Sequence, residues 1–389
     1  MKLKTVPDDF MVTEILSPDL IGKGGYSLYR VKKTNVTTMA VKSELTRTWQ
    51  VKGNELHFAG FKDRRAVTTQ HMTVKGAGYP SVLEGKGFEA EKIGSATRHI
   101  QPRDITSNQF EILVRDLSAR KAEIMEQRVM DFGATGFPNY FDAQRFGSYH
   151  PDFGFIGQAI LKRDARSALR AYMTVPFERD LQPVKRFKAK SMNLWPDWES
   201  MMQVAPRPSN YRSVLTYLVD HPEGYRRALN LIPRDLLSLY LSAYQSHLWN
   251  QIAAKYLSAL PGTTSRGTMT IAGAELPVVK ALDPEQAREL HSTLIAMPNH
   301  RARYDQSSEL ESAAQQVLVE SGFKINDLKA RILEKAYLSK DRRSVLCLPQ
   351  INHVSREKEH GIDKYTSVRL DFTLPRGSYA TLMIKLASH

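Results

Sequence analysis

The sequence predicts an α+β protein in which one domain interrupts another. Strand-like alternation is found in about the first 150 residues, helical periodicity with proline breaks follows, and alternation returns in about the last forty residues. A chain of 389 residues is long enough for two or three domains. We therefore expect residues 1–149 and 346–389 to form one domain around an inserted domain at 150–345.

The expected elements of the first domain follow from the spacing of apolar residues. Residues 26–32 alternate apolar and polar side chains, which predicts a half-buried strand, and residues 37–49 predict a helix. Residues 55–59 and 70–75 predict two strands on either side of the loop that carries Asp63. Catalytic side chains often lie on such loops, because the flanking strands form a rigid scaffold.

Later segments continue these patterns. Residues 108–115 and 368–374 alternate as strands, and apolar residues between 122 and 132 recur at helical spacing. Gly133 is the expected end of that helix, because glycine readily adopts the conformation of a helix C-terminal cap. In the inserted domain, an apolar stripe from Leu237 to Ile252 predicts a helix packed against a core.

The charge of the chain indicates a polyanionic partner. There are 55 Lys and Arg against 41 Asp and Glu, a formal net charge of +14, and nucleic acid is the commonest partner of so basic a protein. Cys347 is the only cysteine, which excludes an intrachain disulfide and suits a reducing cytoplasm. No segment resembles a signal peptide or a membrane-spanning run. We expect a cytoplasmic protein that does not bind membranes.

Asp63 is the candidate reactive group. It lies among Lys62, Arg64 and Arg65, and nearby cations favour the ionised form of a carboxyl group. An ionised Asp63 can act as a nucleophile or base, while the cations attract the phosphates of a polyanionic substrate. The alternative is an ordinary loop in which Asp63 caps a helix or forms a surface ion pair.

A second basic cluster occurs at 185–190, where Lys185, Arg186, Lys188 and Lys190 surround Phe187. Four cations beside an aromatic ring suit contact with phosphates and stacking on a base. A solvated surface loop is the alternative interpretation.

Several common activities lack their motifs. The sequence has no Gly-x-x-x-x-Gly-Lys-Ser/Thr loop, and Gly22–Gly25 lacks the spacing of a dinucleotide or adenosylmethionine site. The histidines are not spaced as ligands on one helical face, so we expect no metal. Ser378 has no Gly-x-Ser-x-Gly elbow around it, which argues against a serine hydrolase. The carboxylate, cations and aromatic rings that remain suit chemistry on a nucleobase.

Six segments, in this order, resemble the TruD family of pseudouridine synthases. They are spread over essentially the whole chain, and the ordered set is far more specific than any one segment. The segments are Lys4–Phe10, Ala59–Gln70, Asn108–Phe110, Pro138–Gly147, Leu241–Gln251 and Leu374–Thr381.

The resemblance implies an isomerase that converts one uridine, in the type case uridine 13 of tRNA, into pseudouridine without a cofactor. It implies tRNA as the partner, and no obligate protein partner is evident. It also implies a catalytic domain with a mixed, largely antiparallel sheet, into which a mostly helical α+β insertion domain is placed.

Residue roles follow from the same resemblance. Asp63 stands at the position of the catalytic aspartate, and Asn108 matches an asparagine that orients that carboxylate. Phe110 matches an aromatic that stacks on the target base, and Lys4 and Phe10 match active-site residues. Judged without the resemblance, Phe110 would be an ordinary core residue and Asn108 a turn or cap residue.

Two further cations complete the expected site. Lys62 is expected to attract the RNA, and Arg145 either contacts phosphate or forms a buried pair with Asp142. For the reaction, the uridine must leave its stack before its glycosidic bond can move from N1 to C5. Asp63 can then attack C1′ or C6, or remove a proton from C2′, and the sequence leaves these routes open.

Two other functions stay open at this point. An RNA-binding protein without the chemistry would need the basic surface but not Asp63. A different tRNA enzyme, such as a methyltransferase or a nuclease, would bind adenosylmethionine or respond to a divalent metal.

Overall fold

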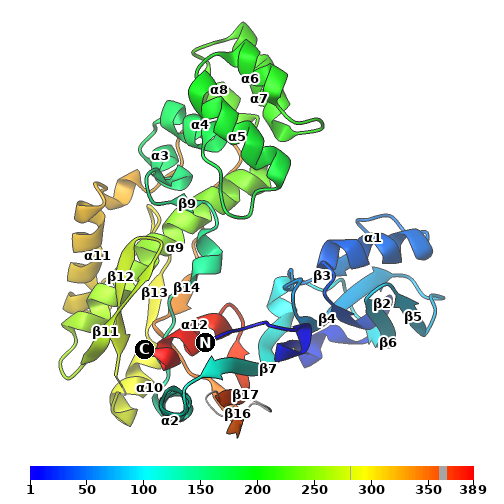
Figure 1. Cartoon of the computed structure of the whole chain (residues 1–389), viewed down its shortest axis with the longest axis vertical. Coiled ribbons are helices and arrows are strands. Elements are labelled where there is room, and N and C mark those ends of the chain that lie inside the picture. Colours follow the sequence, from blue (N-terminus) through cyan, green and yellow to red (C-terminus); the bar gives the residue numbers. More distant parts are fainter. Residues whose placement is uncertain (281, 359–365) are drawn as a thin grey trace. The chain divides into compact units, whose positions relative to one another are not determined.

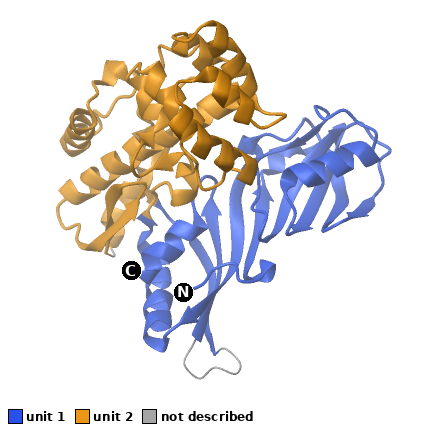
Figure 2. Cartoon of the chain, turned by 45° about the horizontal axis from the view of Figure 1, so that its top comes forward, with its two compact units in different colours: residues 1–137, 347–389 blue, residues 138–346 orange. Residues whose placement is uncertain are grey.

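A computed structural model describes residues 1–280, 282–358 and 366–389 (Figure 1). The chain divides into two compact units. Unit 1 contains Met1–Phe137 and Cys347–His389, and unit 2 contains Pro138–Leu346 (Figure 2). The chain passes between them through two short strands, β8 (Phe137–Pro138) and β15 (Leu346–Cys347).

Unit 1 is built on a nine-stranded sheet with the order β16-β17-β7-β1-β4-β2-β6-β5, in which β3 also pairs with β4. The strands are β1 (Phe10–Leu16), β2 (Ile21–Thr34), β3 (Leu56–Phe58), β4 (Val67–Lys75), β5 (Val82–Gly85), β6 (Phe88–Ala96), β7 (Ile105–Leu117), β16 (Gln350–Lys358) and β17 (Thr366–Pro375). Among the described residues of this sheet, β1 and β4 pair in parallel and the other pairs are antiparallel. The predicted mixed, largely antiparallel sheet is confirmed, as are its five predicted strands.

In the described part of unit 1, the α-helices that accompany this sheet are α1 (Thr38–Thr48), α2 (Ala119–Thr135) and α12 (Ala380–Ser388). α1 packs Val41 and Leu45 into a core that includes Tyr29 and Val31 of β2. Burying a side chain of this size contributes about 1.5 to 3 kcal/mol. Because alternate residues of a strand share a face, this packing also sets the side of the sheet on which Lys33 lies.

The expected end of α2 at Gly133 is wrong. The helix continues to Thr135 and ends at Gly136, whose φ of 78° lies in the left-handed region that favours glycine. Gly133 is needed for a different reason: a Cβ there would lie 2.9 Å from Cγ1 of Ile351 on β16. It allows α2 to pack closely on the sheet.

Unit 2 is mostly helical, and α9 contacts α3, α11 and β12. Its helices are α3 (Ile156–Leu161), α4 (Ala165–Thr174), α5 (Gln182–Leu194), α6 (Trp198–Val204), α7 (Asn210–Asp220), α8 (Tyr225–Asn230), α9 (Arg234–Ala259), α10 (Pro284–Ser292) and α11 (Ser308–Glu320). Its short strands are β9 (Tyr149–His150), β10 (Gly154–Phe155), β11 (Ser265–Ile271), β12 (Ala274–Val279), β13 (Leu294–Ala296) and β14 (Arg342–Ser344). The helix predicted from the Leu237–Ile252 stripe is the central part of α9.

Unit 2 begins at Pro138, whereas the sequence placed the start of the insertion at 150. The backbone N–H of Phe141 donates to Oδ1 of Asn250 at 2.7 Å, and Nδ2 of Asn250 donates to the carbonyl of Phe141 at 2.9 Å. Nε of Arg343 donates to the carbonyl of Asn139 at 2.7 Å. Because these partners are far apart in the chain, a local pattern does not reveal the boundary.

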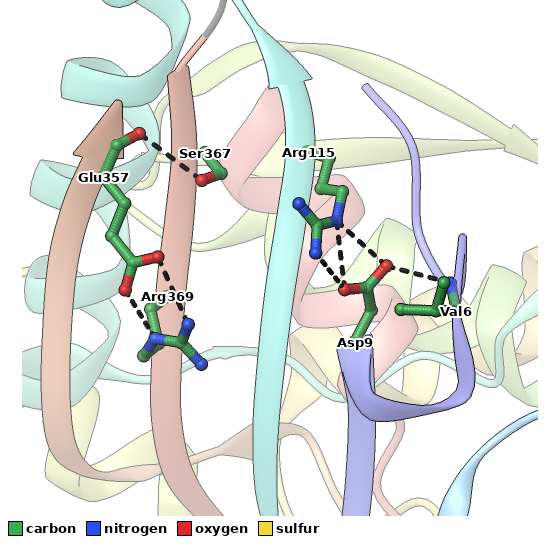
Figure 3. A network of polar contacts seen from close by, with 6 residues as sticks. All are labelled: Val6, Asp9, Arg115, Glu357, Ser367 and Arg369. Atoms are coloured by element: carbon green, nitrogen blue, oxygen red, sulfur yellow. Dashed lines mark hydrogen bonds and ion pairs between the residues drawn. The ribbon is translucent and has the colours of Figure 1, made fainter. Parts of the chain in front are cut away.

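The N-terminal segment of unit 1 is fixed to the sheet by Asp9, whose side chain is almost fully buried. Nε of Arg115 donates to its two carboxylate oxygens at 3.0 and 3.1 Å, Nη2 of Arg115 donates at 2.8 Å, and the N–H of Val6 donates at 3.1 Å (Figure 3). The backbones of Lys2 and Arg115 also exchange hydrogen bonds of 2.8 and 3.0 Å. The segment around Lys4 is therefore held at both ends. Lys2 is bonded to the backbone of Arg115 on β7, and Asp9 is bonded to the side chain of the same arginine.

These contacts predict an acid-dependent loss of stability. Burial acts to raise the pKa of Asp9, but the hydrogen bonds from Arg115 and Val6 outweigh it, and the pKa lies below its ordinary value of 3.8. A carboxyl group with a lowered folded-state pKa stabilises the fold above its unfolded pKa and loses that contribution as the pH falls through the folded pKa. We expect Asp9→Asn to destabilise unit 1 by about 2 kcal/mol at pH 7, and the difference from wild type to shrink below about pH 4.

Hydrogen exchange of the β1 and β7 amides measures this stability within unit 1. Glu357→Gln is the matched control, because Glu357 and Arg369 form an exposed pair at 2.5 and 3.2 Å on the same sheet (Figure 3). An exposed pair contributes less than about 1 kcal/mol. Equal losses in the two variants would contradict the prediction.

Candidate active site

The loop carrying Asp63 joins β3 to β4, as the sequence predicts. Two buried side chains hold its backbone. The N–H of Lys62 donates to Oγ1 of Thr38 at 3.2 Å, and Nζ of Lys33 donates to the carbonyl of Asp63 at 2.8 Å and to that of Val36 at 3.0 Å. Thr38 is the first residue of α1 and Lys33 lies near the end of β2, so two regular elements fix this loop.

Lys33 is fully buried, and sequence reasoning did not identify it. Burial lowers the pKa of Lys33 to about 8; the negative charge of Asp63 opposes this shift, and the positive charge of Lys62 adds to it. At neutral pH the ammonium group therefore remains mostly protonated. It has three N–H donors, and two of them are used by the carbonyls of Asp63 and of Val36, which lies between β2 and α1.

The cation beside the carboxylate of Asp63 is Lys4. Nζ of Lys4 forms an ion pair with Oδ2 of Asp63 and lies 4.0 Å from the centre of the Phe10 ring. Lys4 has a φ of 58°, so the chain turns sharply at this residue. The expectation that sequence neighbours would surround Asp63 is wrong for Lys62, which is directed elsewhere, and for Arg64, whose Nε donates to the carbonyl of Asn35 at 3.5 Å.

Lys62 instead contacts two residues of neighbouring strands. Its Nζ donates to Oδ1 of Asn108 at 2.7 Å and lies 3.0 Å from Oε1 of Glu14. Glu14 on β1 and Asn108 on β7 are directly opposite each other in the sheet, and Oε2 of Glu14 accepts a 2.8 Å bond from the N–H of His71. Asn108 is thus connected to the Asp63 loop through Lys62, and the buried Glu14 is a site residue that sequence reasoning missed.

Phe110 lies between two other rings. Its centre is 6.2 Å from that of Phe10 in an edge-to-face arrangement and 5.4 Å from that of Phe372 in a stacked one. Phe110 is opposite Phe372 on β17 and two residues from Asn108, so it shares the face of Asn108. Only 8% of Phe110 is exposed, so the residue is part of the core at the same time as it borders the candidate site.

Two polar groups near the Asp63 loop are buried without a partner among the residues that the structure describes. They are Oγ1 of Thr68 and Nε2 of Gln70 on β4. Thr68 is opposite Lys33 in the sheet, and Oε1 of Gln70 accepts a 2.9 Å bond from Thr38. A buried polar group without a hydrogen-bond partner lowers the stability of the fold and is uncommon in proteins. This part of β4 therefore carries two polar groups that the fold itself does not satisfy.

Six of the seven predicted site residues belong to unit 1, and the seventh, Arg145, belongs to unit 2. Nε of Arg145 donates to Oγ of Ser246 at 3.2 Å, and its guanidinium carbon lies 5.7 Å from the Phe141 ring centre. These contacts hold the side chain within unit 2.

Only part of the basic cluster at 185–190 is exposed, so it does not form the continuous nucleic-acid-binding surface that the sequence suggested. It lies on α5, where Phe187 and Lys188 are buried and Nζ of Lys188 pairs with Oδ2 of Asp180 at 2.7 Å. Because the segment is a helix, two consecutive positions face the core while Arg186 and Lys190 stay exposed. Base stacking on Phe187 and phosphate contact by Lys188 are therefore excluded.

The described part of the chain contains no group of three or more His, Cys, Asp or Glu side chains arranged to hold a metal ion. Within the same residues, no helix combines the length and apolar character needed to cross a membrane.

Comparison with known proteins agrees with the six ordered segments. The family model of tRNA pseudouridine synthase D (TruD) matches residues 1–386. The chain is 25% identical over 397 residues to the tRNA pseudouridine synthase D of Aquifex aeolicus, covering 99% of this chain and 97% of that protein. It is 25% identical over 394 residues to the tRNA pseudouridine synthase D of Leptospira interrogans, covering 98% and 95%.

A crystal structure of a Methanosarcina mazei protein, titled as a tRNA pseudouridine synthase D, has the same fold. The TM-score is 0.72 at 22% identity, and the match covers 100% of this chain and 93% of that one. The predicted family resemblance and α+β fold class are confirmed. Because the family model covers nearly all of its residues, this chain belongs to the tRNA pseudouridine synthase D (TruD) family.

Proposed function

We propose that this chain converts one uridine of tRNA, uridine 13, into pseudouridine, with Asp63 as the essential carboxylate. Relatives that match nearly the whole chain are named tRNA pseudouridine synthase D, which supports uridine isomerisation in tRNA. The position of Asp63 carries the finer proposal: its side chain is 47% exposed, while Lys33 and Thr38 fix the loop backbone. A substrate can therefore reach the carboxylate, and hydrogen bonds hold the backbone that carries it.

The reaction needs no atom from a second substrate. The C1′–N1 bond of the uridine breaks, a C1′–C5 bond forms, a proton leaves C5 and N1 gains one. The uridine has to be turned out of its stack for the carboxylate to reach it. Asp63 then attacks C1′ or C6, or takes the C2′ proton, and the contacts of Asp63 are compatible with each route.

The neighbouring residues have distinct proposed roles. Lys4 holds the carboxylate of Asp63, while the side chain of Lys62 is bound to Asn108 and Glu14 and so ties the Asp63 loop to β7 and β1. Phe110, which lies between Phe10 and Phe372 and is 8% exposed, is the proposed stacking partner of the target base.

The remaining assignments rest on the family. Unit 1 is the catalytic domain, and unit 2 is the insertion that contributes Arg145 to tRNA binding. A net charge of +14 supports a polyanionic substrate. The cytoplasmic location and the absence of an obligate protein partner remain predictions from the sequence.

The first test of this proposal is Asp63→Asn. We expect the variant to bind tRNA as wild type does but to release no tritium from C5-tritiated, unmodified tRNA, because an amide cannot act as nucleophile or base. Asp152→Asn is the matched control, since Asp152 is an exposed loop carboxylate of unit 2. Mapping the modified nucleotide then tests the assignment of uridine 13. Tritium release by Asp63→Asn at the wild-type rate would rule out the role of Asp63.

A second variant, Lys4→Met, tests the ion pair. The pair is partly exposed, and such pairs contribute up to about 1 kcal/mol, so we expect kcat to fall by up to roughly 5-fold. KM should change little, because the pair holds the carboxylate and not the RNA. Lys2→Met is the control: it removes a cation two residues away whose side chain is exposed and lies 3.5 Å from Asp116. Similar kcat values for the two variants would contradict the proposed role of Lys4 in holding the carboxylate of Asp63.

A further inference from the structure

Phe61 is an exposed aromatic residue next to the proposed catalytic carboxylate. It is 74% exposed, which only Leu181 matches among the exposed large apolar residues of the described chain. A single exposed apolar residue is common on protein surfaces and needs no explanation by itself. The position of Phe61, two residues before Asp63, is what makes its exposure informative.

The ring of Phe61 is presented by a fixed backbone. One side of it rests edge-to-face on Phe58 of β3, with ring centres 5.2 Å apart. The next two residues along the chain are the anchored ones, because the N–H of Lys62 is bonded to Thr38 and the carbonyl of Asp63 to Lys33. A ring held in this way loses little conformational freedom when it binds a partner.

The surroundings of Phe61 are cationic. Nζ of Lys42 lies 5.6 Å from the centre of the Phe58 ring that supports Phe61. Arg64 and Arg65, on the same loop, are both exposed. Aromatic rings combined with nearby cations are typical of surfaces that bind single-stranded nucleic acid, where the rings stack on bases and the cations contact phosphates.

We propose that Phe61 stacks on an unpaired nucleobase of the tRNA that flanks the target uridine. This inference rests on the proposed function of Asp63. Two residues of chain span at most roughly 7 Å, so a base stacked on Phe61 belongs to a nucleotide close in sequence to the one whose sugar meets Asp63. The contact keeps the RNA in place while the uridine is out of its stack.

The variants Phe61→Ala, Phe61→Leu and Phe61→Trp test the stacking. Loss of a base stack corresponds to a roughly 5- to 100-fold weaker interaction, so we expect KM for tRNA to rise by that factor in Phe61→Ala. Phe61→Leu should resemble Phe61→Ala, because it restores apolar area without an aromatic face, and Phe61→Trp should resemble wild type. Phe153→Ala is the matched control, since Phe153 is 42% exposed and also has an edge-to-face neighbour, His150.

A second substrate identifies the stacked base. We expect a tRNA with an abasic site beside the mapped target uridine to raise KM for wild type to the value of Phe61→Ala, and to have no further effect on Phe61→Ala itself. The inference is overturned if Phe61→Ala matches Phe153→Ala on intact tRNA, or if abasic substitution at each flanking nucleotide impairs wild type and Phe61→Ala equally. Absence of tritium release by wild type from any tRNA is a separate outcome, which refutes the proposed function itself.

Discussion

The candidate active site depends on the burial of one ammonium group. Nζ of Lys33 is removed from water and donates to the carbonyls of Asp63 and Val36. A buried charge without hydrogen-bonding partners is strongly unfavourable, so the folded state of this region requires both carbonyls to be in place. The backbone at Asp63 is therefore positioned by a side chain from β2, and Lys62 and Arg64 of the loop itself add contacts to neighbouring elements.

The sheet register brings the other residues together. Glu14 and Asn108 come from adjacent antiparallel strands, and Lys62 reaches both of them from the loop after β3. The segment around Lys4 reaches Asp63 because Asp9 and Lys2 attach it to Arg115. A shift of β1 by one residue relative to β7 would turn Glu14 and Phe10 to the opposite face of the sheet, so pairing and site geometry are not independent.

Local patterns predicted the elements that carry the site better than the contacts within it. The strands on either side of Asp63 and the helix at 37–49 follow from apolar spacing over a few residues. Lys4 and Asp63 form a pair although they are 59 positions apart in the chain. The spacing of residues within one segment cannot predict a contact between two distant segments. The burial of charged residues was also not predicted from the sequence. Charged side chains are usually exposed, but the packing of the folded chain buries Lys33, Glu14 and Lys188.

The order of strands in unit 1 has a consequence for the synthesis of the chain. β7 lies between β1 and β17, but β17 follows β7 only after the whole of unit 2 has been made. At roughly 5 to 20 residues per second, a ribosome needs roughly 10 to 50 s to translate the stretch between them. Throughout that time one edge of β7 has no strand to pair with, and unpaired edges promote aggregation. Completion of this sheet is thus a late event in biosynthesis, and until then this edge of β7 is open to pairing with another chain.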